Sequence, residues 1–355
     1  MIVAGTKTVV TGGAGFIGSH LVDRLLDLGC EVLVIDDFSS GEHGNLAHHE
    51  GHPGLRVAEA DIRDETAMLR LLSGQELVFH LACRNVRLSL KRPTEVHEVN
   101  ATGTLNVLKA AAANRVRRFL YTSSSEVNGT ADIIPMPEDY HFKPETIYGA
   151  SKLTGEYYTQ VFQRSGWLDT VIARPHNNYG PREHYFGHKG EVIPRFIIWA
   201  LAGMPPVIFG DGLQTRDFTY VTETASALVR LMESDRAVGL TVNVCRGDEV
   251  SIRQIAEMIG VLSGRNLVPE HVQGRPSDVL RLFGDNSRLL EILGDTPRVS
   301  IHEGLALTYE WFAANVQPTR EVLESMKPMN WEQTQPEEWL SVRNSAGGVA
   351  IPPNN

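Results

Sequence analysis

The segment TGGAGFIGSH at residues 11–20 constrains the fold more than any other part of the chain. Its glycines Gly12, Gly15 and Gly18 are spaced three apart, after an apolar β-branched run and before a run of helical periodicity. Glycine permits a tight turn and a close approach of the backbone to a ligand, and the start of a helix offers free N–H groups with partial positive charge. This order predicts a site for the pyrophosphate of a dinucleotide, with a plain glycine turn as the alternative.

The residues after the turn predict which dinucleotide binds. Ile17, Leu21, Leu25 and Leu28 form one apolar stripe of a helix, and the run EVLVIDD that follows is typical of a buried strand. Asp36 stands at the end of this strand, where a carboxylate can hydrogen-bond both ribose hydroxyls of an adenosine and repel a 2′-phosphate. The sequence therefore favours NAD over NADP, the alternative being an aspartate that only faces solvent.

Strands and helices alternate over the first half of the chain. Further strands are expected at LRVAEADI, ELVFHLAC, VRRFLYTSSS and DTVIARP, with helices between several of them. This alternation predicts an α/β fold of the Rossmann type, with a doubly wound parallel sheet, and the mixed pattern after residue 180 predicts a smaller α/β lobe. We expect an NAD-binding domain at 1–180, to which segments around 213–245 return, a substrate-binding lobe at 181–327 and a loosely ordered tail at 328–355.

Composition argues against several other classes of protein. The net charge of −10 disfavours binding to nucleic acid or to an anionic membrane, because nothing offsets phosphate repulsion. The cysteines Cys30, Cys83 and Cys245 are far apart, which disfavours a disulfide framework or a zinc site. No apolar run approaches the ~20 residues that span a bilayer, and an early first strand leaves no room for a signal peptide. We expect a cytoplasmic protein.

The run TIYGASK places Tyr148 and Lys152 four residues apart, as neighbours on one face of a helix. A phenol is a poor base near neutral pH because its pKa is about 10. A fixed ammonium group stabilises the phenolate, so Tyr148 can accept a hydroxyl proton while the cofactor oxidises the carbon. A chance surface pair is the alternative. The serine-rich strand end YTSSSEVNG upstream and the dinucleotide site favour catalysis.

Ten motifs occur in a consistent order over about residues 5–315: TGGAGFIGSH, IDDFSSG, ADIRD, HLAC, NATGTLNVL, TSSSEVNG, YGASK, RPHNNYGPR, GDGLQTRDFTYV and GRPSDV. With them the chain resembles the extended short-chain dehydrogenases/reductases of the NAD-dependent nucleotide-sugar epimerase/dehydratase type. The resemblance implies NAD as cofactor and a nucleotide sugar as substrate. It also implies a homodimer, in which helices around 98–115 and 148–164 pair with their symmetry mates in a four-helix bundle.

The resemblance also implies roles for the residues that match the family motifs. Ser124 would hydrogen-bond the reacting hydroxyl, Tyr148 would be the base, Lys152 would hold the nicotinamide ribose, and Glu126 is a further catalytic candidate. The cofactor-binding residues would be Gly12, Gly15, Phe16, Ile17, Gly18, Asp36, Asp37, Asp61 and Ile62 (both at the adenine), Leu81, Ala82, Arg84, Asn100, Tyr148 and Lys152. The substrate-binding residues would be Ser125, Asn177, Val192, Ile193, Arg216, Arg275 and Asp278.

Arginines carry the phosphate contacts in this assignment. Arg84 would lie by the cofactor pyrophosphate. Arg216 and Arg275 would clamp the substrate diphosphate, because a guanidinium fork suits phosphate oxygens better than an ammonium group does. The alternatives are that Arg216 forms a surface ion pair with Asp217 and that Asp278 only orients Arg275.

Members of the family that catalyse different reactions differ at the position of Ser125-Glu126, after the strand. Dehydratases commonly carry Asp-Glu here, where the aspartic acid protonates the leaving hydroxyl, and a serine is a poor replacement acid. A 4-epimerase needs only hydride removal from the sugar, rotation of the 4-keto sugar and hydride return, for which Ser124, Tyr148 and Lys152 suffice. We therefore expect a nucleotide-sugar 4-epimerase, in which Glu126 either orients groups or is a structural carboxylate.

A uronic-acid decarboxylase is the nearest rival, since such enzymes resemble the chain in Ser-Glu and in GDGLQTR, and they oxidise C4 so that the β-keto acid loses CO2. The loop RNVRLSLKRP resembles that of epimerases more than the proline-rich loop of decarboxylases. A dehydratase or 5-epimerase is a further alternative, and Asn128, in place of the family's usual tyrosine, alters the pocket wall. A non-catalytic NAD-binding sensor is the alternative from another class, which the retained catalytic set disfavours.

The loop PREHYFGHKGEVIP is rich in basic residues. His184, His188 and Lys189 are cationic or can become so, and they would face an acidic sugar, an extra phosphate or solvent. The spacing of His176, His184 and His188 fits no common set of metal ligands, so no metal is expected there.

Overall fold

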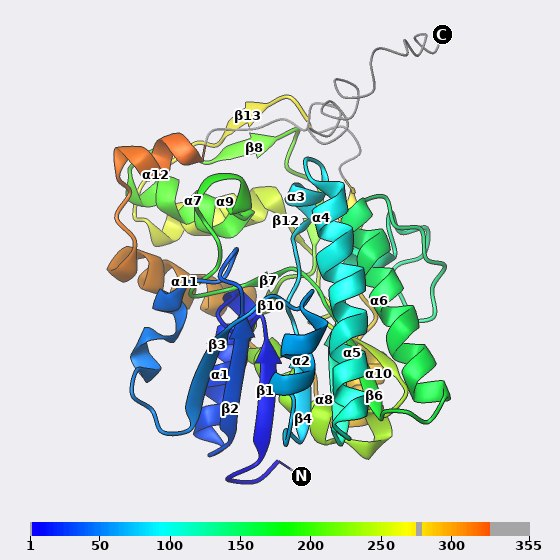
Figure 1. Ribbon diagram of the computed structural model, residues 1–355. Helices are drawn as coiled ribbons and strands as arrows, with labels where there is room; N and C mark the ends of the chain where they lie inside the picture. The colour runs from blue at the N-terminus through cyan, green and yellow to red at the C-terminus, as the bar shows by residue number, and fades with distance from the viewer. Residues whose placement is uncertain (1, 275–278, 327–355) are drawn as a thin grey trace, which may run out of the picture.

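The computed structural model describes residues 2–274 and 279–326. Its centre is a parallel sheet of seven strands in the order β11-β6-β5-β4-β1-β2-β3 (Figure 1). The residues of the inner strands are almost all buried, because helices cover both faces of the sheet. The predicted doubly wound sheet of the Rossmann type is confirmed. The strands are β1 (Lys7–Thr11), β2 (Glu31–Asp36), β3 (Leu55–Glu59), β4 (Leu77–His80), β5 (Arg118–Thr122), β6 (Thr170–Pro175) and β11 (Thr241–Val244).

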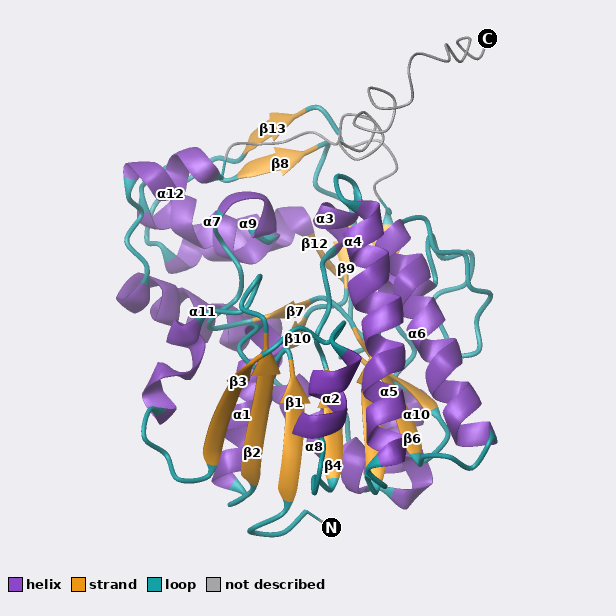
Figure 2. Ribbon diagram, viewed as in Figure 1, coloured by secondary structure: helices purple, strands orange, loops and turns teal. Residues whose placement is uncertain are grey.

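Helices pack against both faces of this sheet (Figure 2). Leu21 and Leu25 of the predicted helical stripe are fully buried against one face. The apolar area that these faces remove from water stabilises the sheet. One face carries α1 (Phe16–Asp27), α8 (Val221–Glu233) and α10 (Ser287–Leu293), and the other carries α2 (Glu65–Leu71), α5 (Thr104–Ala113) and α6 (Ile147–Arg164).

A smaller lobe lies over the carboxyl ends of the strands (Figure 1). Its apolar core includes Phe196, Ile197, Ile255 and Phe312. The chain leaves the large sheet after β6 and returns to it with α8 and β11, while the boundary near residue 180 stays a prediction. The lobe contains α7 (Val192–Leu201), α9 (Ile252–Leu262), α11 (Ile301–Asn315), α12 (Arg320–Ser325) and the short strands β7 (Asn178–Tyr179), β8 (Val207–Phe209), β9 (Thr215–Arg216), β10 (Thr219–Tyr220), β12 (Val250–Ser251), β13 (Glu270–Val272) and β14 (Arg281–Leu282).

Short helical segments connect the larger elements. Those after β4 bring the chain back to α5 across the carboxyl edge of the sheet. They are α3 (Val86–Ser89), α4 (Pro93–His97) and the π-helical turn η2 (Glu98–Gly103). The other short segments are the 3₁₀ turns η1 (His43–His49), η3 (Ser125–Val127), η4 (Gly187–Lys189) and η5 (Asp235–Ala237).

Two contacts hold α6 close to the sheet and so fix the side chains that it carries. Gly155 lies against Tyr121 of β5, where a Cβ atom would come within 2.3 Å of the phenol oxygen. Arg174 of β6 donates two hydrogen bonds of 2.7 Å to the carboxylate of Glu156, and both side chains are buried. Removing one partner of such a pair leaves an uncompensated buried charge and costs about 3–5 kcal/mol.

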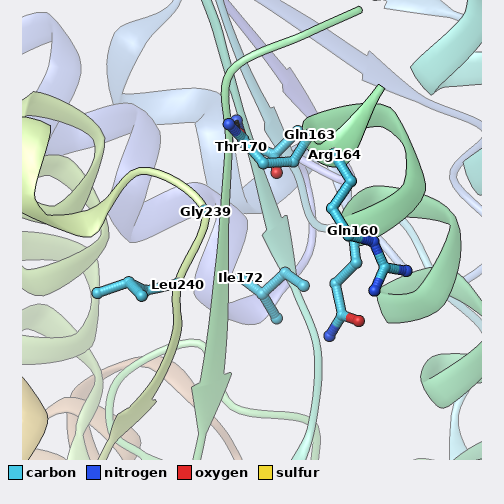
Figure 3. A pocket seen from close by; sticks show the side chains of 7 residues that line it. All are labelled: Gln160, Gln163, Arg164, Thr170, Ile172, Gly239 and Leu240. Atoms are coloured by element: carbon cyan, nitrogen blue, oxygen red, sulfur yellow. Dashed lines mark hydrogen bonds between the residues drawn. The ribbon is translucent and has the colours of Figure 1, made fainter. Parts of the chain in front are cut away.

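Some predicted features lie outside the described residues, namely Arg275, Asp278 and the tail at 328–355. In the described part of the chain, no helix combines the length and the apolar character needed to cross a bilayer. A cavity of about 150 Å³ lies between α6, the start of β6 and residues 239–240 (Figure 3). It lies at the amino ends of the strands, whereas open parallel α/β sheets bind their ligands at the carboxyl ends.

Candidate active site

The glycine turn between β1 and α1 has no room for side chains. Gly12 has a φ of +71°, and a Cβ atom on it would lie 2.7 Å from the backbone nitrogen of Ala82. A Cβ atom on Gly18 would lie 2.1 Å from the carbonyl oxygen of Gly12. The helix begins at Phe16, and its N-cap residue Gly15 contributes no side-chain cap. The first N–H groups of α1 are thus left for a ligand, which fits a pyrophosphate.

Asp36 ends β2 with its carboxylate in a fixed orientation. Its Oδ2 accepts a hydrogen bond from the N–H of Ala14 and its Oδ1 accepts one from the N–H of Phe38, each at 2.9 Å. Asp36 is only 7% exposed, and burial raises the pKa of its carboxyl group. Each oxygen keeps a second lone pair, which a ribose hydroxyl can use. This geometry fits the adenosine ribose of NAD.

Arg84 is engaged by carboxylates of the protein. Its guanidinium donates to Asp37 at 2.8 Å and to Glu95 at 2.9 Å, and it also contacts Ser39. Burial raises the pKa of the Asp37 carboxyl group, but the hydrogen bonds from Arg84 and Ser39 outweigh it and bring that pKa to about 2. The network ties the loop after β4 to the loop after β2. The contacts of Arg84 and Asp37 with the cofactor stay predictions.

Asn100 is buried and uses its whole amide group within the protein. Its Oδ1 accepts a hydrogen bond from the N–H of Arg84 at 2.7 Å, and its Nδ2 donates to the carbonyl oxygen of Arg84 and to the hydroxyl of Ser151, both at 3.1 Å. It therefore ties the loop after β4 to α6. The other predicted cofactor residues are Ile17 in α1, Asp61 and Ile62 after β3, where Asp61 is paired with Arg63, and Leu81 and Ala82 after β4.

The structure brings the three main predicted catalytic residues together. Ser124 follows β5 and lies near enough to the phenol of Tyr148, in the first turn of α6, to lower the pKa of that phenol. Lys152 lies one turn further along, is 2% exposed, and donates from Nζ to the carbonyl oxygen of Thr122 at 2.6 Å. This Nζ also lies 4.5 Å from the centre of the Tyr121 ring. A hydroxyl, a phenol and a fixed ammonium group thus meet at the carboxyl end of β5.

Burial governs the ionisation of these groups. It raises the pKa of Tyr148, the neighbouring Cys83 and Glu126 raise it further, and the hydroxyl of Ser124 lowers it. Burial also lowers the pKa of Lys152. The phenol therefore keeps its proton unless positive charge is brought beside it. Cys83 was missed as a neighbour of this site in the sequence-based prediction, although its place three residues after the end of β4 was an available signal.

Charged residues from the smaller lobe and from the loop before α6 lie near Glu126. Burial raises the pKa of Glu126, Arg216 lowers it, and Glu145 and Glu191 raise it. Glu191 is held by Arg87, whose two terminal nitrogens donate to its two carboxylate oxygens at 2.6 and 2.8 Å. This pair links α3 to the residue before α7. Neither partner was predicted as a site residue, although RNVRLSLKRP had been singled out as a motif.

The other predicted substrate residues have varied surroundings. Ser125 is buried at the start of η3. Asn177 has a φ of +23° and a buried amide nitrogen without a hydrogen-bond partner among the described residues. Arg216 donates to the carbonyl oxygen of Val279 at 2.7 Å. Asp217 is fully buried and accepts hydrogen bonds from two backbone N–H groups, which is not the setting of a surface ion pair. Val192 and Ile193 form the first turn of α7.

A Rossmann-type sheet, a glycine turn before its first helix and a Ser–Tyr–Lys set at the carboxyl edge define a dinucleotide-dependent enzyme. The chain belongs to the NAD-dependent epimerase/dehydratase family, whose model matches residues 8–245. It is 38% identical to the UDP-glucose 4-epimerase of Mycolicibacterium smegmatis over 310 residues, covering 86% of this chain and 98% of that protein. It is 34% identical to UDP-glucuronic acid decarboxylase 2 of Arabidopsis thaliana, covering 88% of this chain and 69% of that protein.

A solved structure from Bacillus cereus, the UDP-glucuronic acid 4-epimerase with UDP-glucuronic acid and NAD, is also similar. It matches 87% of this chain and 99% of that chain, with a TM-score of 0.81 and 30% identity. NAD is the cofactor of the family to which this chain belongs. The narrow turn at Gly12, the uncapped start of α1 and the oriented carboxylate of Asp36 fit this cofactor.

Proposed function

We propose that the protein is an NAD-dependent nucleotide-sugar 4-epimerase. The observation that carries the proposal is that Ser124, at the end of β5, lies near Tyr148 and the buried Lys152 in the first turns of α6. The same strand end provides Ser125 where a dehydratase needs an acid. The relatives named above include two 4-epimerases and a decarboxylase of UDP-sugars, which supports a nucleotide sugar as the substrate.

The catalytic residues would act mainly on one proton. NAD, when bound, supplies the hydride acceptor and donor for C4 of the sugar and a positively charged ring. Ser124 would hydrogen-bond the C4 hydroxyl, and Tyr148 would take its proton during oxidation and return it during reduction. Lys152 would stabilise the phenolate and hold the nicotinamide ribose. No step of this sequence requires Glu126 to move a proton.

The nucleotide and diphosphate would bind against the smaller lobe. The first turn of α7, at Val192 and Ile193, would contact the nucleotide. The buried amide nitrogen of Asn177 has a donor to offer, since no described residue accepts from it. Arg216 lies close enough to Glu126 to lower its pKa, which supports a diphosphate site beside the catalytic residues.

A uronic-acid decarboxylase is the second candidate. It is favoured by Glu126, which is half-buried and near the phenol of Tyr148, and by the similarity to the Arabidopsis decarboxylase.

Incubation with UDP-, dTDP-, GDP- and CDP-sugars, with products identified by mass spectrometry and NMR, separates the candidates. A 4-epimerase gives a product of unchanged mass and inverted C4. Loss of CO2 would establish the decarboxylase, and loss of water would establish a dehydratase. Absence of both product and NADH-like absorbance with every sugar tested would favour the non-catalytic NAD-binding sensor.

We also propose a homodimer that pairs α5 and α6 with their symmetry mates. The two helices lie side by side on one face of the sheet (Figure 1). Tyr157 and Val161, one turn apart on α6, are 47% and 42% exposed, which leaves an apolar surface for a second copy. Light scattering should give twice the mass of the chain at micromolar concentration, and a monomer would contradict the proposal. The cytoplasmic location stays a prediction.

A further inference from the structure

Three side chains meet between α1 and η1, namely Asp23, His48 and His49. We call them the histidine cluster. The Nε2 atoms of His48 and His49 each lie 2.8 Å from the same carboxylate oxygen, Oδ1 of Asp23. The three ligand atoms lie within 4.8 Å of one another. We propose that the histidine cluster binds one divalent transition-metal ion, with Zn²⁺ as the reference ion.

The two nitrogen–oxygen distances in the cluster are somewhat shorter than those around a bound Zn²⁺ ion. Zinc is held by imidazole nitrogen and carboxylate oxygen at about 2.0–2.2 Å, so that tetrahedral ligand atoms lie roughly 3.4 Å apart. Each nitrogen lies 2.8 Å from the oxygen, so these two distances must lengthen by about 0.6 Å to admit the ion. His48 is 49% exposed and His49 is 16% exposed, so the ion can enter from solvent and a water can complete its coordination.

The two oxygens of Asp23 have separate partners. Oδ2 accepts a hydrogen bond from Arg182 at 2.5 Å, while Oδ1 faces the two imidazoles. An ion on Oδ1 therefore does not require the pair with Arg182 to break. The guanidinium charge opposes a second cation nearby, so we expect micromolar affinity rather than the tighter binding of a structural zinc site.

The cluster stands next to the cofactor turn. The segment that carries it places the N–H of Glu42 3.0 Å and Nδ2 of Asn45 2.9 Å from the carbonyl oxygen of Ala14, within the glycine turn. Arg182 donates to the carbonyl oxygen of Asn45 at 3.0 Å. A metal ion at the cluster would cross-link η1 to α1 and hold this network in its folded arrangement. Binding to the folded state alone raises the melting temperature by mass action.

The test uses the full-length protein without an affinity tag, freed of metal by a chelator. Calorimetry with Zn²⁺ should show one ion per chain, and Co²⁺ should give the visible absorption of a tetrahedral site. His48→Gln, His49→Gln and their combination remove ligands near the surface, and their folding is checked by the melting temperature in chelator. The double variant should bind Zn²⁺ roughly 100-fold more weakly and lose the metal-dependent rise in melting temperature.

His302→Gln is the matched control, because His302 is an exposed histidine on α11, outside the histidine cluster. It should bind one Zn²⁺ with the affinity of the parent protein. The proposal is overturned if the parent protein binds no Zn²⁺ up to millimolar concentration. Equal stoichiometry and affinity in the parent and the double variant would overturn it as well.

Discussion

The two sides of the candidate site are built differently. On the cofactor side, Gly12, Asp36 and Lys152 are fixed by backbone atoms: a turn without room for a Cβ atom, two N–H donors, and the carbonyl oxygen of Thr122. On the substrate side, the groups around Glu126 come from short loops and from the smaller lobe, and charged side chains hold one another there.

The difference separates binding of the cofactor from choice of the substrate. Backbone geometry at the edge of a parallel sheet fits any ligand that contains the same pyrophosphate and ribose. Ion pairs between lobes depend on single side chains, so they can differ between enzymes that keep the same sheet. Substitutions on the cofactor side should therefore affect NAD binding or the chemistry itself, and those on the substrate side should affect KM.

Tyr148→Phe should have the largest effect. The ring remains, but the group that exchanges a proton with the sugar hydroxyl is lost, so kcat should fall by roughly 100-fold or more. The NAD content of the purified protein should not change. Turnover within a few-fold of the parent protein would remove Tyr148 from the mechanism.

Asp36→Ala should come next. It removes the proposed acceptor for the ribose hydroxyls and leaves the N–H groups of Ala14 and Phe38 without their partner, so NAD should bind roughly 10-fold more weakly or worse. Discrimination against NADP should also relax. Asp36→Asn is the control, since its amide oxygen can still accept one of the two bonds. Unchanged NAD affinity in Asp36→Ala, measured by calorimetry, would mean that another residue contacts the ribose.

The sequence predicted the cofactor side better than the substrate side for a physical reason. The glycine spacing and the acidic end of β2 are local signals, since strand, turn and helix follow one another in the chain. The Arg87–Glu191 pair joins residues about a hundred positions apart, and Cys83 becomes a neighbour of Tyr148 only because β4 and β5 are adjacent. Asn100 was predicted near the cofactor, but its amide group is used to tie Arg84 to α6, which no local pattern indicates.

Arg87→Met tests the substrate side. It leaves Glu191 unpaired near Tyr148 and Glu126, so KM for the sugar nucleotide should rise by roughly 3- to 10-fold while NAD affinity stays the same. The extra negative charge should raise the pKa of Tyr148 further and move the activity profile to higher pH. The double variant Arg87→Met/Glu191→Met removes the unpaired charge and should recover the pH profile. Weaker NAD binding in either variant would contradict the division between the two sides.

The stability of the folded protein should depend on pH through His80, which ends β4. This histidine is buried, with Nδ1 2.7 Å from Oγ1 of Thr11 and Nε2 2.9 Å from Oγ1 of Thr104, and burial, helped by the charge of Lys152, lowers its pKa to about 3. The unfolded chain takes up a proton near pH 6.5 and the folded chain does not. The free energy of unfolding should therefore fall below pH 6.5 by up to about 1.4 kcal/mol per pH unit for this residue.

Urea unfolding of the parent protein and of His80→Gln between pH 7.5 and about pH 4.5 measures this effect. Glutamine can hydrogen-bond both threonines but does not titrate, so the slope in the variant should be smaller. His20 and His176 also have pKa values lowered by burial, to about 4, and should account for part of the remaining slope. Equal slopes in the two proteins would mean that His80 does not contribute.

Glu126→Gln should have the smallest effect on activity. The amide keeps the shape of the carboxylate but cannot act as a base, and 4-epimerisation removes no proton from C5. Activity should stay within roughly 3-fold of the parent protein, whereas Ser124→Ala should lose much more because the reacting hydroxyl loses a hydrogen bond. Near-complete loss of activity in Glu126→Gln would make Glu126 a working base.

The most direct test of 4-epimerisation is the fate of C5 in heavy water. The parent protein is incubated in heavy water with the nucleotide sugar that it converts, and the product is analysed by NMR and mass spectrometry. If the enzyme only removes hydride from C4 and returns it, the product has inverted C4, unchanged mass and no deuterium at C5. Deuterium at C5 would contradict the account and favour elimination or 5-epimerisation, and loss of CO2 would contradict it in favour of decarboxylation.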